Sequence, residues 1–201
     1  MDSIGASNMS TDRSLAIIEG APIAVMSALF LTPLALFWLR VWGPLRPFDV
    51  AAVPSPSAIA VCVAVAVCLA AARPPASYFR VRGFERDGRL YRAVGVRLFR
   101  KVVPNGDWMN RARRRQDRDF RLIGSKADAA GWLPKTNASE KSHLAFMLLG
   151  ILSAGYAAYV GWTMWAIVLT VGNVVTNLYP VLLQRYTRAR LIRLTSRSAR
   201  R

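Results

Sequence analysis

Residues 144–183 read LAFMLLGILSAGYAAYVGWTMWAIVLTVGNVVTNLYPVLL, two apolar runs that meet at Gly161. The first run is Leu144–Val160 and the second is Trp162–Leu183. A helix of about 20 apolar residues is long enough to cross the hydrocarbon core of a membrane. Because little more than one glycine separates the runs, the sequence predicts two membrane-spanning helices joined as a tight helical hairpin.

Two further apolar stretches precede this hairpin. The first, Leu15–Leu39, is long enough to cross a membrane, although it contains one acid and two prolines. The second, Ala58–Ala72, reaches a spanning length when it is counted from Val50. Hydrophobic residues make up 53% of the 201-residue chain. The sequence therefore predicts an all-α membrane protein with about four transmembrane helices.

The net charge of +17 is confined to blocks that adjoin the apolar stretches. Residues 73–142 hold 18 of the 28 Lys and Arg residues, and residues 185–201 hold 7 more and no acid. Basic loops stay on the cytoplasmic side, so both blocks and both chain ends are expected there, in a multi-pass protein of a bacterial-type cell membrane. Charges placed beside membrane spans favour anionic lipid headgroups over nucleic acid as their partner.

These patterns divide the chain into five segments. We expect a disordered N-terminal tail over 1–14 and an N-terminal membrane pair over 15–75. A basic cytoplasmic and interfacial segment follows over 76–142. The transmembrane hairpin then occupies 143–184, and a basic cytoplasmic tail occupies 185–201.

The basic segment contains one strongly patterned stretch. Leu90, Val94, Leu98 and Val102 recur every four residues, while arginines and a lysine occupy the positions between them. Side chains four residues apart share one face of a helix. The spacing therefore predicts a basic amphipathic helix that lies in the membrane interface.

Glu140 and His143 are the first candidates for chemistry. His143 is the only histidine, and a spacing of three residues puts it on the same helix face as Glu140. A carboxylate can orient an imidazole that acts as a general base. The alternative is helix-start chemistry, in which Ser139 or Asn137 caps the helix and the dipole favours Glu140. With one histidine and two cysteines inside an apolar run, no metal site is expected.

Polar residues at the end of the last apolar run form a second candidate group. Asn177 and Gln184 carry amides that are costly in apolar surroundings unless they are paired, and Asn173 shares the helix face of Asn177. Arg185 and Arg188 lie one turn apart at the expected membrane boundary and could bind an anionic headgroup or substrate. The alternative is a plain anchor whose arginines extend to the headgroups.

Asp107 and the arginines after it form a third candidate group. Asp107 ends the turn Pro104-Asn-Gly-Asp107, where it either caps the following helix or acts as a functional acid. Arginines at 111 and 113–115 could hold the phosphates of a donor such as a coenzyme A thioester. Attraction to lipid headgroups is the alternative for this cluster.

Three blocks of sequence resemble a known family in their order and spacing. They are Tyr78-Phe-Arg with Phe84-Glu-Arg-Asp-Gly-Arg-Leu-Tyr91, Gly95-Val-Arg with Pro104-Asn-Gly-Asp107, and Asn177-Leu-Tyr-Pro with Gln184-Arg-Tyr-Thr-Arg188. The family is that of the glycosyl-4,4'-diaponeurosporenoate acyltransferases, which is linked to staphyloxanthin-type carotenoid synthesis. The resemblance covers about residues 76–192. Glu140-Lys-Ser-His143 stands where the family has Glu-x-x-His at the start of a membrane helix.

The resemblance implies an integral membrane acyltransferase that moves a fatty acyl group onto a sugar hydroxyl of a glycosylated carotenoid. His143 would deprotonate the hydroxyl and Glu140 would orient His143. The donor would be acyl-CoA or a similar co-substrate, with no tightly bound cofactor, and the acceptor would be lipid-like and glycosylated. The remaining candidates would bind substrate, namely Asn177, Gln184, Arg185, Arg188 and Asp107.

Two other functions are compatible with the same sequence. One is a non-enzymatic membrane scaffold that binds anionic lipid through the amphipathic stretch and the arginines. The other is an acyltransferase that acts on another lipid or glycan. All three share one geometric expectation. Because the hairpin is tight, the end of the last span should lie level with the start of the third, which brings Gln184 and Arg185 close to Glu140 and His143.

Overall fold

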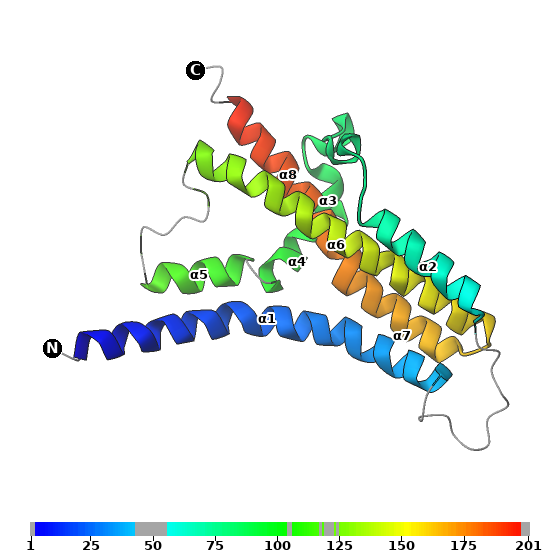
Figure 1. The fold of residues 1–201 in the computed structure, drawn as a ribbon. Coiled ribbons are helices and arrows are strands. Elements are labelled where there is room, and N and C mark those ends of the chain that lie inside the picture. Colours follow the sequence, from blue (N-terminus) through cyan, green and yellow to red (C-terminus); the bar gives the residue numbers. More distant parts are fainter. Residues whose placement is uncertain are drawn as a thin grey trace.

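The computed structural model describes residues 3–42, 56–103, 106–116, 118, 123 and 125–197, and within them all regular structure is helical (Figure 1). Two 3-10 turns, Ala76–Phe79 and Gly83–Glu85, follow the helix Ala58–Ala71. A π-turn, Val174–Leu178, lies between the last two α-helices of the chain. The α-helices are α1 (Ser3–Trp42), α2 (Ala58–Ala71), α3 (Arg89–Ala93), α4 (Val96–Val102), α5 (Asp107–Gln116), α6 (Lys126–Tyr159), α7 (Thr163–Asn173) and α8 (Tyr179–Arg197).

Within the described residues, three helical stretches are long and apolar enough to cross a membrane, namely Gly20–Trp42, Ala127–Tyr159 and Thr163–Ser196. A fourth span is present if α2 and the turns of Ala76–Glu85 are taken as one span with a bend of 58°. At most 28% of the residues in each of the three spans are buried inside the protein, so their outer faces need an apolar solvent. The protein is therefore an all-α membrane protein, as the sequence predicts.

The predicted hairpin forms and is longer than expected. Gly161 has φ +77° and makes the turn between α6 and α7. The first arm begins at Lys126 rather than near residue 143, because Ser125 and Asp128 form a capping box and Pro134 does not interrupt the helix. The second arm continues through α8 to Arg197, so residues 185–197 are helical and are not a separate tail.

The second half of α1 packs against the hairpin. Phe30, Leu34, Phe37 and Val41 recur every three or four residues and are all buried. The indole Nε1 of Trp38 donates a hydrogen bond to Ser153 Oγ on α6, at 3.0 Å. The helix already begins at Ser3, so the segment expected to be a disordered tail is helical from there on. Residues 3–14 contain no proline and a single glycine, so no residue there stops the helix.

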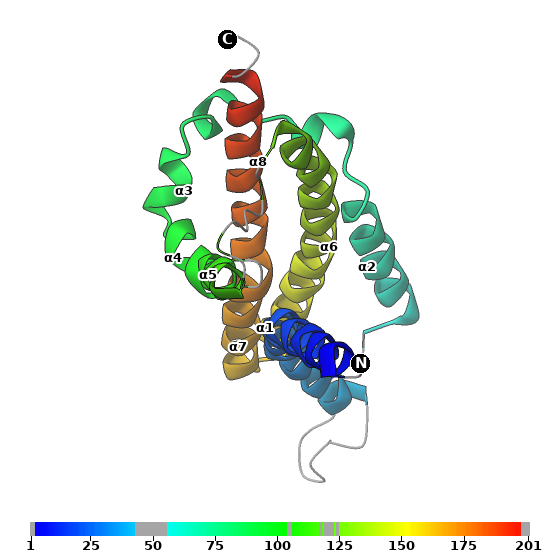
Figure 2. The same ribbon diagram turned by 90° about the vertical axis from the view of Figure 1, so that its left-hand side faces the viewer.

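The other elements lie on two sides of the hairpin. Figure 2 shows α2 beside α6, and α3 and α4 beside α8. The amphipathic helix expected over 89–102 is instead two short helices, because the chain turns at Gly95, whose φ is +78°. The apolar stripe itself is exposed, from 41% at Val94 to 69% at Val102.

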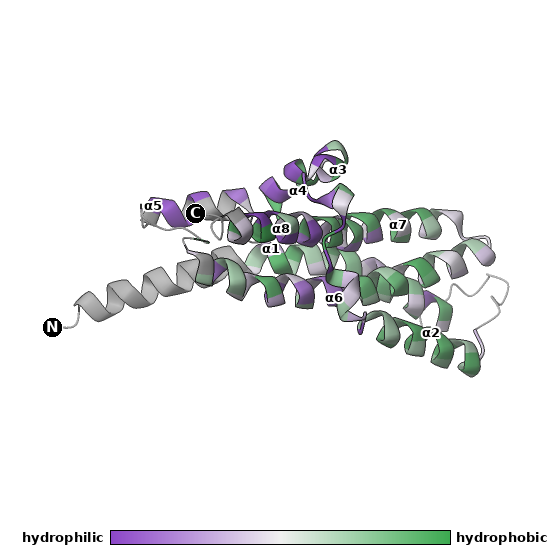
Figure 3. Cartoon of the chain, turned by 90° about the horizontal axis from the view of Figure 1, so that it is seen from above, coloured by the Kyte–Doolittle hydropathy of each residue, from purple (hydrophilic) through white to green (hydrophobic). Residues whose placement is uncertain are grey.

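Hydropathy separates the two ends of the molecule. In Figure 3 the hydrophobic colour covers α2 and α7, while α5, α4 and the region of α8 near the C-terminus carry the hydrophilic colour. The turn between α6 and α7 lies at the end opposite to the C-terminus (Figure 1). The basic segment and the end of α8 thus share one end of the bundle, as the charge pattern predicts.

Candidate active site

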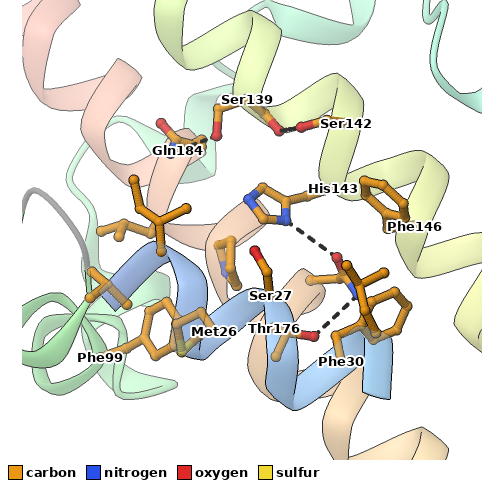
Figure 4. Close-up of a pocket in the computed structure, with 16 residues that line it drawn as sticks. Met26, Ser27, Phe30, Phe99, Ser139, Ser142, His143, Phe146, Thr176 and Gln184 are labelled. Atoms are coloured by element: carbon orange, nitrogen blue, oxygen red, sulfur yellow. Dashed lines mark hydrogen bonds between the residues drawn. The ribbon is translucent and has the colours of Figure 1, made fainter. Parts of the chain in front are cut away.

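A cavity of about 380 Å³ lies between α1, α4, α6 and the π-turn with α8 (Figure 4). Figure 4 shows His143 near its centre, with Ser139, Ser142 and Gln184 on one side. Met26, Phe30 and Phe99 lie on the other side of His143. The cavity therefore has a polar end at Ser139, Ser142 and Gln184 and a more apolar end, where Ser27 and Thr176 also lie. The remaining lining residues are Ile23, Ser27, Leu31, Val103, Phe146, Thr176, Asn177, Pro180 and Leu183.

A chain of hydrogen bonds fixes the orientation of His143. The Nδ2 group of Asn173 donates to the carbonyl oxygen of Met147, at 2.8 Å. Asn173 Oδ1 then accepts from Asn177 Nδ2, at 2.9 Å, which turns Asn177 Oδ1 toward His143 Nδ1, at 3.3 Å. Because this oxygen can only accept, Nδ1 carries the proton of the neutral ring and the lone pair is on Nε2.

The local sequence explains why two asparagines can sit here. The π-turn Val174–Leu178 closes with a hydrogen bond from the N–H of Tyr179 to the carbonyl of Val174, and such turns widen a helix locally. Asn173 and Asn177 flank and occupy this turn and are 5% and 2% exposed. On α6, Gly150 makes the space, because a Cβ atom there would lie 2.5 Å from Asn173 Cγ.

The polar end of the cavity carries amide and hydroxyl groups. Gln184 Nε2 donates to Ser139 Oγ at 3.2 Å, and Ser142 Oγ donates to the carbonyl of Ser139 at 2.9 Å. Gln184 and Ser139 belong to different arms of the hairpin. The structure thus confirms the expectation that the end of the last span lies beside the start of the Glu140–His143 stretch.

Glu140 does not pair with His143, so the expectation that it orients the imidazole is wrong. Glu140 is fully buried, and its Oε1 accepts from Arg185 Nε at 2.9 Å. Its Oε2 accepts from Arg188 Nη2. Both arginines are on α8, which packs against α6 and brings their guanidinium groups to the carboxylate of Glu140. Asn177 takes over the contact with His143.

Glu140 belongs to a buried ion cluster, defined here as Glu85, Glu140, Arg185 and Arg188. Arg185 Nη1 lies 2.7 Å from Glu85 Oε1, and Arg185 Nη2 donates to the carbonyl of Tyr78 at 3.1 Å. Two carboxylates face two guanidinium groups, so the formal charges balance. The cluster joins α6, α8 and the 3-10 turn Gly83–Glu85, which are far apart in the sequence.

Neighbouring groups complete the surroundings of the cluster. Tyr91 Oη donates to Glu85 Oε1 at 2.5 Å, and burial together with this carboxylate raises the pKa of Tyr91, so the phenol stays protonated. The guanidinium of Arg185 lies over the ring of Tyr78, at 4.5 Å, and that of Arg188 over Phe79, at 5.0 Å. The arginine side chains are 14% and 4% exposed, so they do not extend to the headgroups.

Asp107 lies apart from this assembly. Its carboxylate forms a salt bridge with Arg100, at 2.6 Å, at the start of α5, and it does not line the cavity. Among the arginines that follow it, Arg111, Arg114 and Arg115 are exposed on α5. Pro104 and Asn105 of the same motif lie outside the described residues.

Sequence reasoning missed three parts of the site. Glu85 is one of seven acids among 18 Lys and Arg residues in 73–142, and this excess of bases is a signal that could have marked it as a partner for arginine. Gly150 carries no sequence signal of its own, because its role depends on Asn173 lying opposite. The wall contributed by α1 also follows only from the way α1 crosses the hairpin (Figure 1).

The profile of one protein family, described as glycosyl-4,4'-diaponeurosporenoate acyltransferase, matches residues 75–197. This segment contains the ion cluster, His143 and both asparagines, and it confirms the extent of the resemblance expected from the three sequence blocks. Neither the curated proteins nor the solved structures include a match to the chain. Since the profile covers more than half of the 201 residues, the chain belongs to the glycosyl-4,4'-diaponeurosporenoate acyltransferase family.

Proposed function

We propose that this membrane protein transfers a fatty acyl group to a sugar hydroxyl of a glycosylated carotenoid, with His143 as the general base. The donor is a thioester such as acyl-CoA. The observation that carries the proposal is the chain from Met147 through Asn173 and Asn177 to His143, which leaves Nε2 as an acceptor in the cavity. A general base needs this combination of fixed orientation and open lone pair.

The proposed reaction proceeds by direct attack of the hydroxyl on the donor. His143 Nε2 takes the hydroxyl proton as the sugar oxygen bonds to the thioester carbonyl carbon. The carbon–sulfur bond then breaks, and the thiolate leaves and takes the proton from the imidazolium. The products are an ester and a free thiol, and the histidine returns to its neutral form. The acyl group passes directly from the thioester to the sugar, so no residue of the protein is acylated.

The other residues support this chemistry from fixed positions. Gln184 and Ser142 lie at the polar end, where they can hydrogen-bond the sugar. Arg185 and Arg188, expected to bind substrate, serve instead to position α8 against α6 through Glu140. Arg111 and Arg115 are exposed on α5, where they attract the phosphates of the donor or anionic headgroups on the cytoplasmic side of a bacterial-type cell membrane.

The test measures ester formation in membranes that contain the glycosylated acceptor. His143→Ala and His143→Asn should both lower ester formation by about 10²- to 10⁴-fold, because each lacks the base. The asparagine variant is the informative one, since its amide can replace the Nδ1 contact to Asn177 but cannot take a proton. Recovery of activity in His143→Asn would contradict the base role and assign His143 to structure.

Acyl transfer to another lipid or glycan is the alternative that the same experiment addresses. Lipid extracts of a deletion strain and of the complemented strain should differ in an acylated glycosyl carotenoid. A difference confined to another acylated lipid or glycan would keep the base role and replace the acceptor. No difference in any ester would favour a scaffold that binds anionic lipid.

A further inference from the structure

We infer that α1 forms the wall that measures the acyl chain of the donor, and that Ser27 and Phe30 determine which chain lengths are used. This inference rests on the proposed function and adds the subsite that holds the chain. α1 lies outside residues 75–197, which match the family profile, yet it supplies five of the lining residues. They are Ile23, Met26, Ser27, Phe30 and Leu31.

One continuous face of α1 performs two tasks. Residues 23, 26, 27, 30, 31 and 34 follow the spacing of a single helical face. From Phe30 onward this face packs into the core with Leu34, Phe37 and Val41. From Ile23 to Leu31 the same face lines the cavity, so Phe30 belongs to both parts. The cavity therefore ends where α1 begins to pack closely on the hairpin.

Phe30 lies at the apolar end of the cavity, where α1 meets the hairpin. It is 6% exposed, and its ring packs edge-on against Phe146 of α6, with ring centroids 6.0 Å apart. Both rings line the cavity, on the side away from Ser139 and Gln184 (Figure 4). A chain whose carbonyl lies at His143 would therefore run toward Phe30 and stop there.

The size and shape of the space favour the acyl chain over the carotenoid. A water molecule takes about 30 Å³ in the liquid, and a methylene group is of similar size, so a cavity of about 380 Å³ holds on the order of a dozen methylene groups. A saturated chain can bend into such a space through its staggered torsions. A conjugated polyene is a rigid rod, and the pair Phe30–Phe146 blocks a straight path.

The experiment compares substitutions on the two faces of α1. Ser27→Phe fills the cavity, while Val25→Phe adds the same side chain at a position that is 58% exposed and does not line it. Phe30→Ala lengthens the cavity, and Leu29→Ala, at a residue 53% exposed, is its control. Mass spectrometry of the ester product gives the ratio of long to short acyl chains.

Ser27→Phe should lower this ratio about tenfold and Phe30→Ala should raise it, because one methylene group in an apolar pocket changes selection by about 10-fold or more. The two control variants should keep the wild-type ratio. If Phe30→Ala fails to fold, the acyl-chain ratio of Ser27→Phe compared with that of Val25→Phe still tests the inference. An unchanged ratio in Ser27→Phe, or a change in polyene preference with the acyl ratio unchanged, would overturn the inference.

A second measurement separates this inference from the proposed function. If the wild-type protein makes no ester, the proposed function fails. A photoreactive fatty acid with a diazirine near its methyl end then tests the subsite alone. Cross-linking within residues 23–31 that Ser27→Phe abolishes and Val25→Phe preserves would support the subsite. Equal cross-linking in both variants would reject it.

Discussion

Glu140 has no access to solvent, and its two oxygens contact the guanidinium groups of Arg185 and Arg188. A carboxylate in this position is stable only while its partners remain. Breaking a buried ion pair by removing one partner typically costs about 3–5 kcal/mol, because the remaining charge loses its compensation. None of the four residues of the ion cluster lines the cavity, yet replacing any one of them should destabilise the fold.

Glu140→Ala should lower the free energy of unfolding by about 3 kcal/mol or more, since it leaves Arg188 buried without its carboxylate. The measurement is thermal unfolding of the protein in detergent or nanodiscs. Asp87→Ala is the control, because Asp87 pairs with Arg89 on an exposed surface, where such pairs contribute at most about 1 kcal/mol. Equal destabilisation by the two substitutions would contradict the structural role of the cluster.

Asn177→Leu should reduce ester formation by about 10²-fold, because His143 loses the acceptor that fixes its tautomer and position. Asn173→Leu should act in the same direction through Asn177. Since the two amides act in one chain, the double variant should lose little more than either single variant. Multiplied losses in the double variant would show that the asparagines act independently.

At the scale of elements, the π-turn Val174–Leu178 and α6 depend on each other. The turn places Asn173 over Gly150, where a Cβ atom would lie 2.5–2.8 Å from the three outer atoms of the amide. Contacts this short force a shift of the side chain or of the helix. The approach of α7 to α6 at this level is thus coupled to the hydrogen-bond chain that ends on His143.

Gly150→Ala should lower both stability, by about 1–3 kcal/mol, and ester formation, because Asn173 must leave the carbonyl of Met147. Gly155→Ala is a matched control on the same helix, since the added methyl group meets no atom within 4 Å beyond its chain neighbours and the nearby backbone of α6. Alanine has the higher helix propensity, so the control should be neutral or slightly stabilising. Normal activity in Gly150→Ala would refute the proposed packing.

At the scale of the whole molecule, the features set by local pattern were predictable from the sequence. The apolar runs and Gly161 predict the hairpin, and the hairpin predicts that Gln184 lies near the Glu140–His143 stretch, where it contacts Ser139. The hairpin also brings Arg185 close to Glu140, as expected, but the place of Glu85 in the ion cluster was not predictable in this way. Arg185, Glu140 and Glu85 come from three elements, and the Arg185–Glu85 contact joins residues 100 positions apart.

The break at Gly95 shows a second limit of sequence reasoning. Leu90, Val94, Leu98 and Val102 keep the periodicity of one helix, but Tyr179 Oη donates to the carbonyl of Val94 at 3.1 Å. This contact with α8 takes a carbonyl that lies at the junction of α3 and α4. Tertiary contact thus overrides the local pattern while the apolar stripe stays exposed, as an interfacial position requires.

The separation of charge along the bundle predicts how it is oriented in the membrane. The turn at Gly161 is uncharged, whereas the opposite end holds the basic segment and the last turns of α8. Because basic segments resist translocation, the α6–α7 turn should face outward and the end of α8 should face the cytoplasm. Thr163 and Ser196 are exposed and lie near these two ends, so they are suitable labelling positions.

With Cys62 and Cys68 replaced by alanine, Thr163→Cys should react with a membrane-impermeant maleimide in intact cells. Ser196→Cys should react only after the membrane has been permeabilised, since its side chain would lie on the cytoplasmic face. Labelling of both positions in permeabilised cells provides the control for accessibility. Reaction of Ser196→Cys but not of Thr163→Cys in intact cells would invert the orientation, and with it the side from which a coenzyme A thioester reaches His143.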